Sequence, residues 1–358
     1  MMSSTWGSKC KISIFGESHG PAIGVVMDGL PAGWEIDYEE ILRQMRRRAP
    51  GRDELSTPRK EEDVPRILSG VYEDKTTGAP LCAVIENRNT RSGDYANLKN
   101  RPRPGHADFT GFVRYDGFND PRGGGHFSGR ITAPLVFCGA VIRQLLRQRG
   151  ITVGGHIAAI AGVEDRRFDP VRIGANELER LGTMSLPLLD GSVEASMRGA
   201  VAAAKEAGDS VGGVVECAVC GLPAGVGNPF FDSLESVLAH LLFSIPAVKG
   251  VEFGDGFGLT AMRGSGANDS YCIEQGQVRT RTNHNGGILG GISNGMPVVF
   301  RVAVKPTPSI AREQTTVLLG EKIETTIAIE GRHDPCIVQR ALPVVEAAAA
   351  LAVYELLR

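Results

Sequence analysis

Five of the seven histidines lie in segments punctuated by glycine or proline, where a side chain can face a ligand rather than a core. They are His19, His106, His126, His284 and His333. Imidazole changes charge near neutral pH, which makes histidine the usual side chain for proton transfer. Asp108 and Asp334 stand two and one residues after His106 and His333, where a carboxylate could orient the ring. A single loop histidine is more often a hydrogen-bonding residue than a catalyst, but the recurring context favours acid–base chemistry.

Basic residues gather in three groups beside turns. The groups are Arg46–Arg48, Arg122 with Arg130, and Lys305 with Arg332. With 39 basic and 41 acidic residues the net charge is −2, which argues against a general nucleic-acid or membrane-surface binder. Local basic groups on a nearly neutral chain favour a small polyanionic ligand. Taken alone, Arg46–Arg48 is slightly more typical of a solvated helix end than of a ligand site. The hydroxyls of Lys305–Ser309, KPTPS, would suit a phosphate.

The stretch Arg101–Arg130 carries two histidines and five arginines and shows no helical or strand periodicity. We therefore expect a long ordered loop, because its five aromatic residues argue against disorder. Gly123–Gly125 would let the backbone approach a ligand closely. A glycine-rich turn with solvated arginines is the alternative. The chain lacks GxxxxGK[ST], and no G-x-G-x-x-G follows a strand here, so neither familiar nucleotide loop is supported.

The seven cysteines are scattered, and an odd count without a secretory signal suits a reducing cytoplasm. Cys217 and Cys220 form a C-x-x-C in an apolar run that predicts a strand, where residues three apart face opposite sides. We expect both in the core rather than at a metal. His156 and His240, in strand-like and helical segments, are also expected to be structural. No apolar run predicts a membrane span.

Strands are expected at Lys11–Phe15 and Ile23–Leu30, followed by a helix that a capping box at Asp37–Glu40 opens. That helix should end at Arg46–Arg48, where its dipole favours cations. A hairpin is expected over Arg66–Val84.

The same order of elements returns later in the chain. The sequence GLPAG occurs at 29–33 and again at 221–225. A strand at Gly213–Cys220 precedes the second copy, and a capping box at Asp232–Glu235 follows it. The hairpin returns at Gly287–Val304. A long apolar helix is expected at Arg130–Gln148 and its second copy at Arg340–Leu357. An additional helix is expected at Val193–Ala207.

These correspondences predict one α+β domain over residues 1–358, duplicated internally as two β-α-β halves at roughly 10–150 and 205–358. Helices as apolar as the one around Ala347–Ala350 would be layered between two mainly antiparallel sheets.

The motifs jointly resemble the chorismate synthase family. They are FGESHG, RRR before Pro-Gly, RPGHADFT, RGGGHFSGR, GLPAGVG, IPAVKGVEFGDGF, NHNGGILGGISNG, KPTPS and GRHDPC, in the order of that family from about residue 10 onward. The resemblance implies conversion of 5-enolpyruvylshikimate 3-phosphate to chorismate by 1,4-anti elimination of phosphate. Reduced FMN is then required without net redox change.

The resemblance also implies roles for individual residues. His19 resembles the histidine that protonates the departing phosphate, and His106 the one beside the reduced flavin. Asp334 resembles the carboxylate that takes a proton by way of the flavin N5. Arg48 resembles an arginine on the NADPH or substrate side, and Arg130 one that binds substrate. FMN contacts would be His126, Phe127, Ser128, Pro246, Ala247, Gly290, Lys305, Pro306, Thr307, Pro308, Ser309 and Arg332.

Two departures from the family pattern stand out. Many members have Arg where His126 stands, and the arginine expected after Pro50-Gly51 is displaced, with Arg52 early and Glu54 near the usual site. The second departure weakens NADPH binding as the route of flavin reduction, so an external flavin reductase is the other possible partner. The family pattern further implies a cytoplasmic homotetramer that binds neither nucleic acid nor membrane.

Two other classes of function fit fewer of these residues. A metal-dependent hydrolase would use Glu17, His19, His106, Asp108 and Asp334. An RNA- or ribosome-associated protein would use Arg46–Arg52, and its binding would fall steeply with salt. We expect no bound metal.

Overall fold

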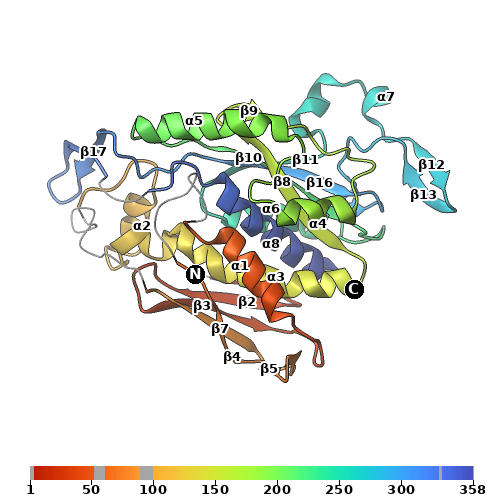
Figure 1. Cartoon of the computed structure of the whole chain (residues 1–358), viewed down its shortest axis with the longest axis horizontal. Coiled ribbons are helices and arrows are strands. Elements are labelled where there is room, and N and C mark those ends of the chain that lie inside the picture. The colour runs from red at the N-terminus through yellow and green to blue at the C-terminus, as the bar shows by residue number, and fades with distance from the viewer. Residues whose placement is uncertain (1–3, 52–60, 89–99, 330–332, 358) are drawn as a thin grey trace. The chain divides into compact units, whose positions relative to one another are not determined.

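The computed structural model describes residues 4–51, 61–88, 100–329 and 333–357. The chain divides into two compact units, each made of three segments. Unit 1 comprises Met1–Cys138, Arg198–Gly212 and Pro306–Arg340; unit 2 comprises Gly139–Met197, Gly213–Lys305 and Ala341–Arg358. Helices mix with antiparallel sheets, as predicted for an α+β fold (Figure 1).

Unit 1 contains a five-stranded antiparallel sheet in the order β1-β2-β3-β7-β4. Its strands are β1 (Thr5–Trp6), β2 (Lys11–Gly16), β3 (Ala22–Asp28), β4 (Arg66–Ser69) and β7 (Leu81–Glu86), with the small hairpins β5 (Val71–Tyr72)–β6 (Lys75–Thr76) and β17 (Gln314–Leu318)–β18 (Ile323–Ile327). Its helical segments include α1 (Tyr38–Arg48), α2 (Asp108–Arg114), the 3-10 helices η2 (Arg122–Phe127) and η3 (Gly129–Ile131), and most of α5 (Glu194–Glu206). The predicted strands β2 and β3 and the predicted helix α1 are thus confirmed.

Helix α1 begins as its sequence predicts. The Asp37 side chain accepts a hydrogen bond from the Glu40 amide at 3.1 Å, which satisfies one of the unpaired donors of the first turn. Arg46, Arg47 and Arg48 fill the last turn. Arg47 and Arg48 are buried, so the solvated helix end applies only to Arg46.

Unit 2 contains the second antiparallel sheet, in the order β11-β16-β10-β8-β9. Its strands are β8 (Thr152–Ile160), β9 (Val163–Glu164), β10 (Gly213–Cys220), β11 (Val248–Phe253) and β16 (Val298–Val304), with hairpins β12 (Tyr271–Glu274)–β13 (Gln277–Thr280) and β14 (Ile288–Leu289)–β15 (Ile292–Ser293). Its helical segments include α4 (Ala175–Thr183), η4 (Gly191–Val193), η5 (Phe230–Asp232), α6 (Leu234–Ser244), η6 (Gly256–Ala261) and α7 (Gly264–Ala267).

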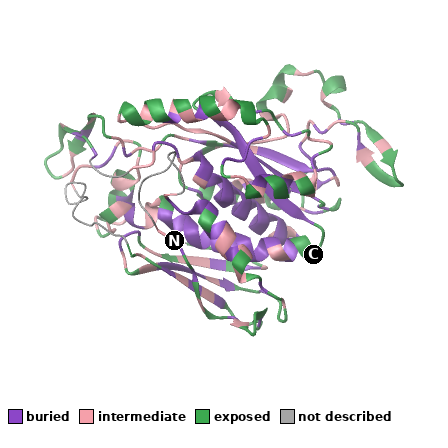
Figure 2. Ribbon diagram, viewed as in Figure 1, coloured by how far each residue is buried: buried purple, intermediate pink, exposed green. Residues whose placement is uncertain are grey.

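The core of unit 2 includes the later part of α3 (Thr132–Gln148) and most of α8 (Val338–Leu356), both almost wholly buried (Figure 2). A Cβ on Gly139 would lie 2.2 Å from that of Ala347, so the two helices touch backbone to backbone here. Arg143 donates to Glu346 at 2.7 Å, and Glu346 also accepts from the Gly155 amide of β8 at 3.1 Å. This buried ion pair ties both helices to the sheet. Among the described residues, 129–148 could cross a membrane by length and apolarity, but that segment is 78% buried.

A second buried polar group lies on β8 and β10. His156 is fully buried, with Nδ1 3.0 Å from Asp165 and Nε2 2.8 Å from Glu216. Burial acts to lower the pKa of His156, but hydrogen bonds to the two carboxylates outweigh it and raise that pKa. The structural role predicted for His156 agrees with this placement. Cys217 and Cys220 are buried on β10, as predicted for core residues.

Three sequence predictions were wrong in detail. Arg101–Arg130 is not one long loop, because it contains α2, η2 and η3. Gly111 weakened the helical pattern of α2 in the sequence. Glycine is required at this position because a Cβ would lie 2.6 Å from the Phe127 ring. The N-cap of α6 is Ser233 rather than Asp232, since the Ser233 hydroxyl accepts from the Ser236 amide at 3.0 Å. Strand β14 pairs with the short β15 and not with β16, because 290–291 turn the chain at once.

We propose that the two halves arose by internal duplication, although the compact units do not coincide with them. Strands β3 and β10 are each central in a five-stranded sheet and each lead into GLPAG. The first and last glycines of both copies have positive φ, with 93° and 83° at Gly29 and Gly33 and 80° and 96° at Gly221 and Gly225. The later strands β7 and β16 lie beside β3 and β10 in the two sheets and pair antiparallel with them.

Candidate active site

The backbone of Gly123–Gly125 separates the two histidines predicted to be catalytic. All three glycines have positive φ, at 59°, 84° and 53°. A Cβ on Gly123 would lie 2.1 Å from the His19 imidazole, and one on Gly124 would lie 3.0 Å from the ring of His106. The Gly125 carbonyl accepts from the Ser18 amide at 3.1 Å, which fixes the turn that carries His19. The glycines are therefore needed for close approach, here to the histidines themselves.

His106 belongs to a compact charged group at the start of α2. Its Nδ1 lies 2.6 Å from Asp108 Oδ1, while Arg103 donates to both Asp108 oxygens at 2.7 and 2.8 Å. Burial acts to raise the pKa of Asp108, but the hydrogen bonds from Arg103 and His106 outweigh it and hold that pKa well below its ordinary value. Nδ1 therefore donates to the carboxylate, and Nε2, 3.3 Å from Arg103 Nη2, accepts from that guanidinium. Arg103 also donates to the Ser309 hydroxyl at 3.1 Å.

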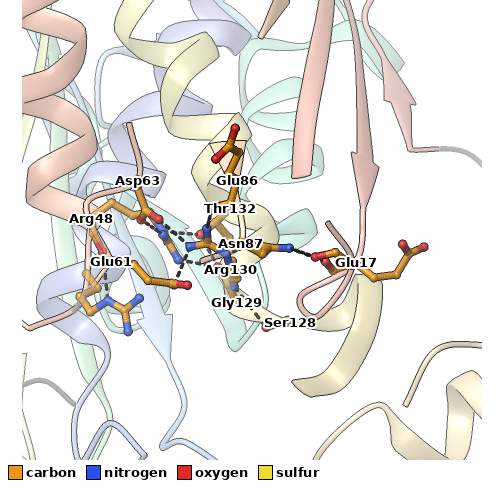
Figure 3. Close-up of polar contacts among 12 residues, drawn as sticks. Glu17, Arg48, Glu61, Asp63, Glu86, Asn87, Ser128, Gly129, Arg130 and Thr132 are labelled. Atoms are coloured by element: carbon orange, nitrogen blue, oxygen red, sulfur yellow. Dashed lines mark hydrogen bonds and ion pairs between the residues drawn. The ribbon is translucent and has the colours of Figure 1, made fainter. Parts of the chain in front are cut away.

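Asn87, the residue after β7, connects the His19 turn to Arg130 (Figure 3). Its Nδ2 donates to the carbonyl oxygens of Glu17 at 3.0 Å and Gly20 at 2.8 Å. Its Oδ1 accepts from Arg130 Nε at 2.5 Å. A single amide thus fixes the distance between the candidate acid and a candidate substrate-binding arginine.

Arg48 and Arg130 converge on the carboxylate of Asp63 (Figure 3). Arg130 Nη1 lies 2.5 Å from Asp63 Oδ1 and 2.8 Å from Glu61 Oε2, and Arg48 Nη1 pairs with Asp63 Oδ2. Arg48 also donates to the Thr132 hydroxyl at 3.2 Å. Burial lowers the pKa of Arg48 to about 10, so it stays charged at neutral pH. The two arginines are close together, as a shared anion would require.

Asp334 precedes α8 and pairs with Arg340 of that helix. Arg340 Nε donates to the Arg48 carbonyl at 3.0 Å, so Asp334 is one residue removed from the arginine pair. Asp334 lies four residues before the start of α8 at Val338, too far away to cap that helix. Arg332, predicted to contact FMN, lies outside the described residues.

His126, Phe127 and Ser128 follow the three glycines, and each has a partner in unit 1. His126 Nδ1 is 2.8 Å from the Gly16 carbonyl and Nε2 is 2.8 Å from the Ser4 hydroxyl. Phe127 lines a pocket with Phe112, Asp108 and Gly124. Ser128 caps η3 by accepting from the Arg130 amide. Both His126 nitrogens are thus engaged within the protein.

Among the other predicted FMN contacts, Ala247 and Lys305 are neighbours within unit 2. The Lys305 amide donates to the Ala247 carbonyl at 2.9 Å, and Ala247 has a positive φ of 74°. Gly290 turns β14 into β15 with open space where a Cβ would stand. Pro246 is exposed beside Ala247.

The turn Pro306–Ser309 places two hydroxyl groups in a buried position. The Thr307 hydroxyl is buried and has no hydrogen-bond partner among the described residues. Its backbone is anchored, because the Thr307 carbonyl accepts from Ser210 at 2.7 Å. The Ser309 hydroxyl accepts from Arg103, so its own proton is free to be donated. Buried hydroxyl donors at a rigid turn after a lysine are suitable partners for phosphate oxygens.

Three residues of this site were not singled out from the sequence. Arg103 was visible in the RPGHAD motif but received no role, while Asp63 and Asn87 carried no signal that separates them from other polar residues. Within the described part of the chain, no three His, Cys, Asp or Glu side chains meet as a metal-binding group.

Two oriented histidines, an ionised aspartate and paired arginines define an enzyme built for proton transfer on an anionic substrate. A profile of the chorismate synthase family matches residues 10–357. The chain is 48% identical over 357 residues to a chorismate synthase of Dehalococcoides mccartyi, covering 99% of this chain and 96% of the relative. It is 46% identical over 349 residues to that of Thermococcus kodakarensis, covering 98% and 96%. A crystal structure of a chorismate synthase superposes with a TM-score of 0.77 at 27% identity, covering 98% of this chain and 92% of the other.

The chain therefore belongs to the chorismate synthase family, as its motifs predicted. It is a lyase of the shikimate pathway and of aromatic amino acid biosynthesis. Family membership excludes the hydrolase and RNA-associated alternatives.

Proposed function

We propose that the network around Gly123–Gly125 is where this chain eliminates phosphate from 5-enolpyruvylshikimate 3-phosphate to give chorismate. The observation that carries the proposal is the junction of His19, Arg130 and Arg48 through Asn87 and Asp63, with His106 on the other side of the glycines. The reaction breaks a C–O bond to phosphate and a C–H bond across the ring. It therefore needs one group that protonates and another that accepts a proton.

His19 is the acid that gives its proton to an oxygen of the departing phosphate. Its side chain is 7% exposed and rests on the Gly123 backbone, so the ring has little freedom to rotate away. Arg130, held to the same turn by Asn87, supplies positive charge beside the leaving group. A charge fixed in advance stabilises the developing anion without reorganisation.

Asp334 is the final acceptor of the ring proton. Its pairing with Arg340 fixes the carboxylate. Reduced FMN, when bound, supplies an electron-rich ring beside the substrate and ends each turnover unchanged. Thr307 and Ser309 would hold its phosphate. His106, held at Nδ1 by Asp108 and at Nε2 by Arg103, would stand beside the reduced ring.

The test is turnover of variants supplied with chemically reduced FMN under anaerobic conditions. His19→Ala and His106→Ala should each lower turnover by about 10²-fold or more, the usual scale for acid–base groups. Both variants should fold. Circular dichroism and thermal unfolding, which report only on structure, check this. Normal turnover in either variant would remove that residue from the mechanism.

FMN and substrate should also bind cooperatively, because an anionic substrate stacked on flavin would close the segment Arg101–Arg130 over both. By thermodynamic linkage, substrate must then tighten FMN by the factor by which FMN tightens substrate. A fluorescence titration of FMN with and without substrate measures that factor. Equal affinities would contradict the coupling.

The source of reduced flavin and the assembly follow from the family pattern alone. We propose a cytoplasmic homotetramer that receives reducing equivalents either from NADPH or from an external flavin reductase. Anaerobic mixing with NADPH distinguishes the two sources, because only self-reduction bleaches bound FMN in the absence of a reductase. Light scattering gives the number of subunits.

A further inference from the structure

The arginines assigned to the substrate are already engaged by acids of the same chain. The side chains of Arg48 and Arg130 are 3% and 5% exposed, and that of Asp63 is fully buried between them. Glu61 adds a second carboxylate at 2.8 Å from Arg130. Most of the remaining N–H groups of Arg130 also have acceptors, in Asn87 and the Glu86 carbonyl. A ligand anion therefore finds few donors unless an acceptor leaves.

The charges of this group balance in the structure as described. Two guanidinium groups face two carboxylates, so a phosphate or carboxylate added to them would bring excess negative charge into a dry site. Exchanging Asp63 for the ligand keeps the balance, because a carboxylate offers guanidinium the same geometry as a phosphate oxygen pair. Burial acts to raise the pKa of Asp63, but Arg48 and Arg130 lower it, so the carboxylate is ionised in this position.

The backbone indicates that the ion pairs hold Asp63 in place. Its φ is 50°, in the left-handed region that residues other than glycine seldom adopt. The neighbouring residues Glu62 and Val64 are exposed, and only the acid turns inward. Leaving the arginines would relieve this strained conformation, which favours release once another anion can take over.

We propose that Asp63, assisted by Glu61, occupies the place of a substrate anion between Arg48 and Arg130 and is exchanged for that anion on binding. The inference rests on the proposed role of the two arginines in substrate binding. The free protein thus keeps two buried cations paired and oriented, and it binds anions more weakly than an empty arginine pair would.

The test is binding of inorganic phosphate to Asp63→Asn, measured by calorimetric titration without flavin or substrate. We expect at least tenfold tighter binding than in the wild type. We also expect phosphate to raise the unfolding temperature of the variant more, because it restores the missing counter-charge. Glu62→Gln is the matched control, since it removes the same charge from an exposed neighbour, and it should behave as the wild type.

Two outcomes would overturn the proposal. Weaker phosphate binding in Asp63→Asn would mean that the carboxylate orients the arginines for the ligand instead of standing in for it. Unchanged binding would mean that the arginine pair takes no anion. If Asp63→Asn does not fold, Glu61→Gln leaves the central ion pairs intact, and it should tighten phosphate binding by about threefold; no gain there contradicts the exchange equally.

A double variant shows at which site the phosphate binds. Asp63→Asn combined with Arg48→Gln is balanced in charge, so it should lose the tighter phosphate binding of Asp63→Asn. If phosphate instead bound at Pro306–Ser309, the double variant would keep that tighter binding. Since none of these titrations requires turnover, their failure is distinct from failure of the catalytic assignments, which His19→Ala tests separately.

Discussion

Replacing Gly123 by alanine should displace the proposed acid without touching its chemistry. The new Cβ would lie 2.1 Å from the His19 ring, whereas carbon atoms in contact are normally about 3.5–4.0 Å apart. The imidazole must therefore retreat by more than about 1 Å. Displacement on that scale costs about 10²-fold in rate even when every reacting group is present. The left-handed φ of 59° adds a stability loss of about 1–2 kcal/mol.

The assay for Gly123→Ala is chorismate formation with pre-reduced FMN, together with thermal unfolding. Gly162→Ala is the control for backbone strain, because Gly162 has a φ of 82° and nothing within 4 Å of a Cβ. It should lose comparable stability and keep its turnover. Gly123→Ala with turnover near that of Gly162→Ala would refute the claim that this backbone positions His19.

Three further predictions follow from named contacts. Asp108→Asn should lower turnover, because it frees His106, and should cost about 1.5–3 kcal/mol of unfolding free energy at pH 7. This cost should shrink as pH falls below about 4, because the lowered pKa of Asp108 means that only its ionised form stabilises the fold. Urea unfolding at pH 7 and pH 3 checks this. His156→Gln should cost more stability at pH 6 than at pH 9. Because the pKa of His156 is raised in the folded protein, the stabilisation by its charged ring is complete below about 6.5 and is lost as pH rises through the folded pKa. Unfolding at both pH values tests this, and a pH-independent cost contradicts a charged His156. Asp334→Asn should fold and bind FMN but turn over far more slowly, because an amide cannot accept the proton; near-normal activity would remove Asp334 as the base.

The elements that the sequence predicts best are those with strong local signals. Helix α1 has an aspartate cap and a basic last turn, and β10 was predicted with the bounds observed. The long apolar helices α3 and α8 lie within about two residues of the prediction. Local capping, periodicity and composition suffice here, because the signal and the structure lie within one turn or strand.

The predictions were wrong where a tertiary contact, rather than the local sequence pattern, decided the structure. Helix α2 was missed because Gly111 weakens its pattern, and only the Phe127 ring explains that glycine. Asp232 and Ser233 are both good caps, and the preceding turn η5 selected the second. Such choices depend on contacts that no window of sequence contains.

The candidate site was predictable as a set of motifs but not as a network. His19 and His106 were singled out, while their separation by the glycine backbone was not. Asp63 meets Arg130 across 67 residues, and neither the acidic run around it nor its charge indicates that partner. Ion pairs of this kind are fixed by the fold, so sequence identifies the participants without identifying the pairs.

The ion pair between Arg143 and Glu346 has a consequence for how the chain folds as it is made. Its two members are 203 residues apart, and the later one lies on α8, near the end of the chain. A buried arginine without its carboxylate is costly, so the dry interior of unit 2 cannot form while α8 is still unmade. Domains commonly fold in order during synthesis, but unit 2 must wait for its last helix to be released. Removal of α8 should therefore leave unit 2 without a finished interior.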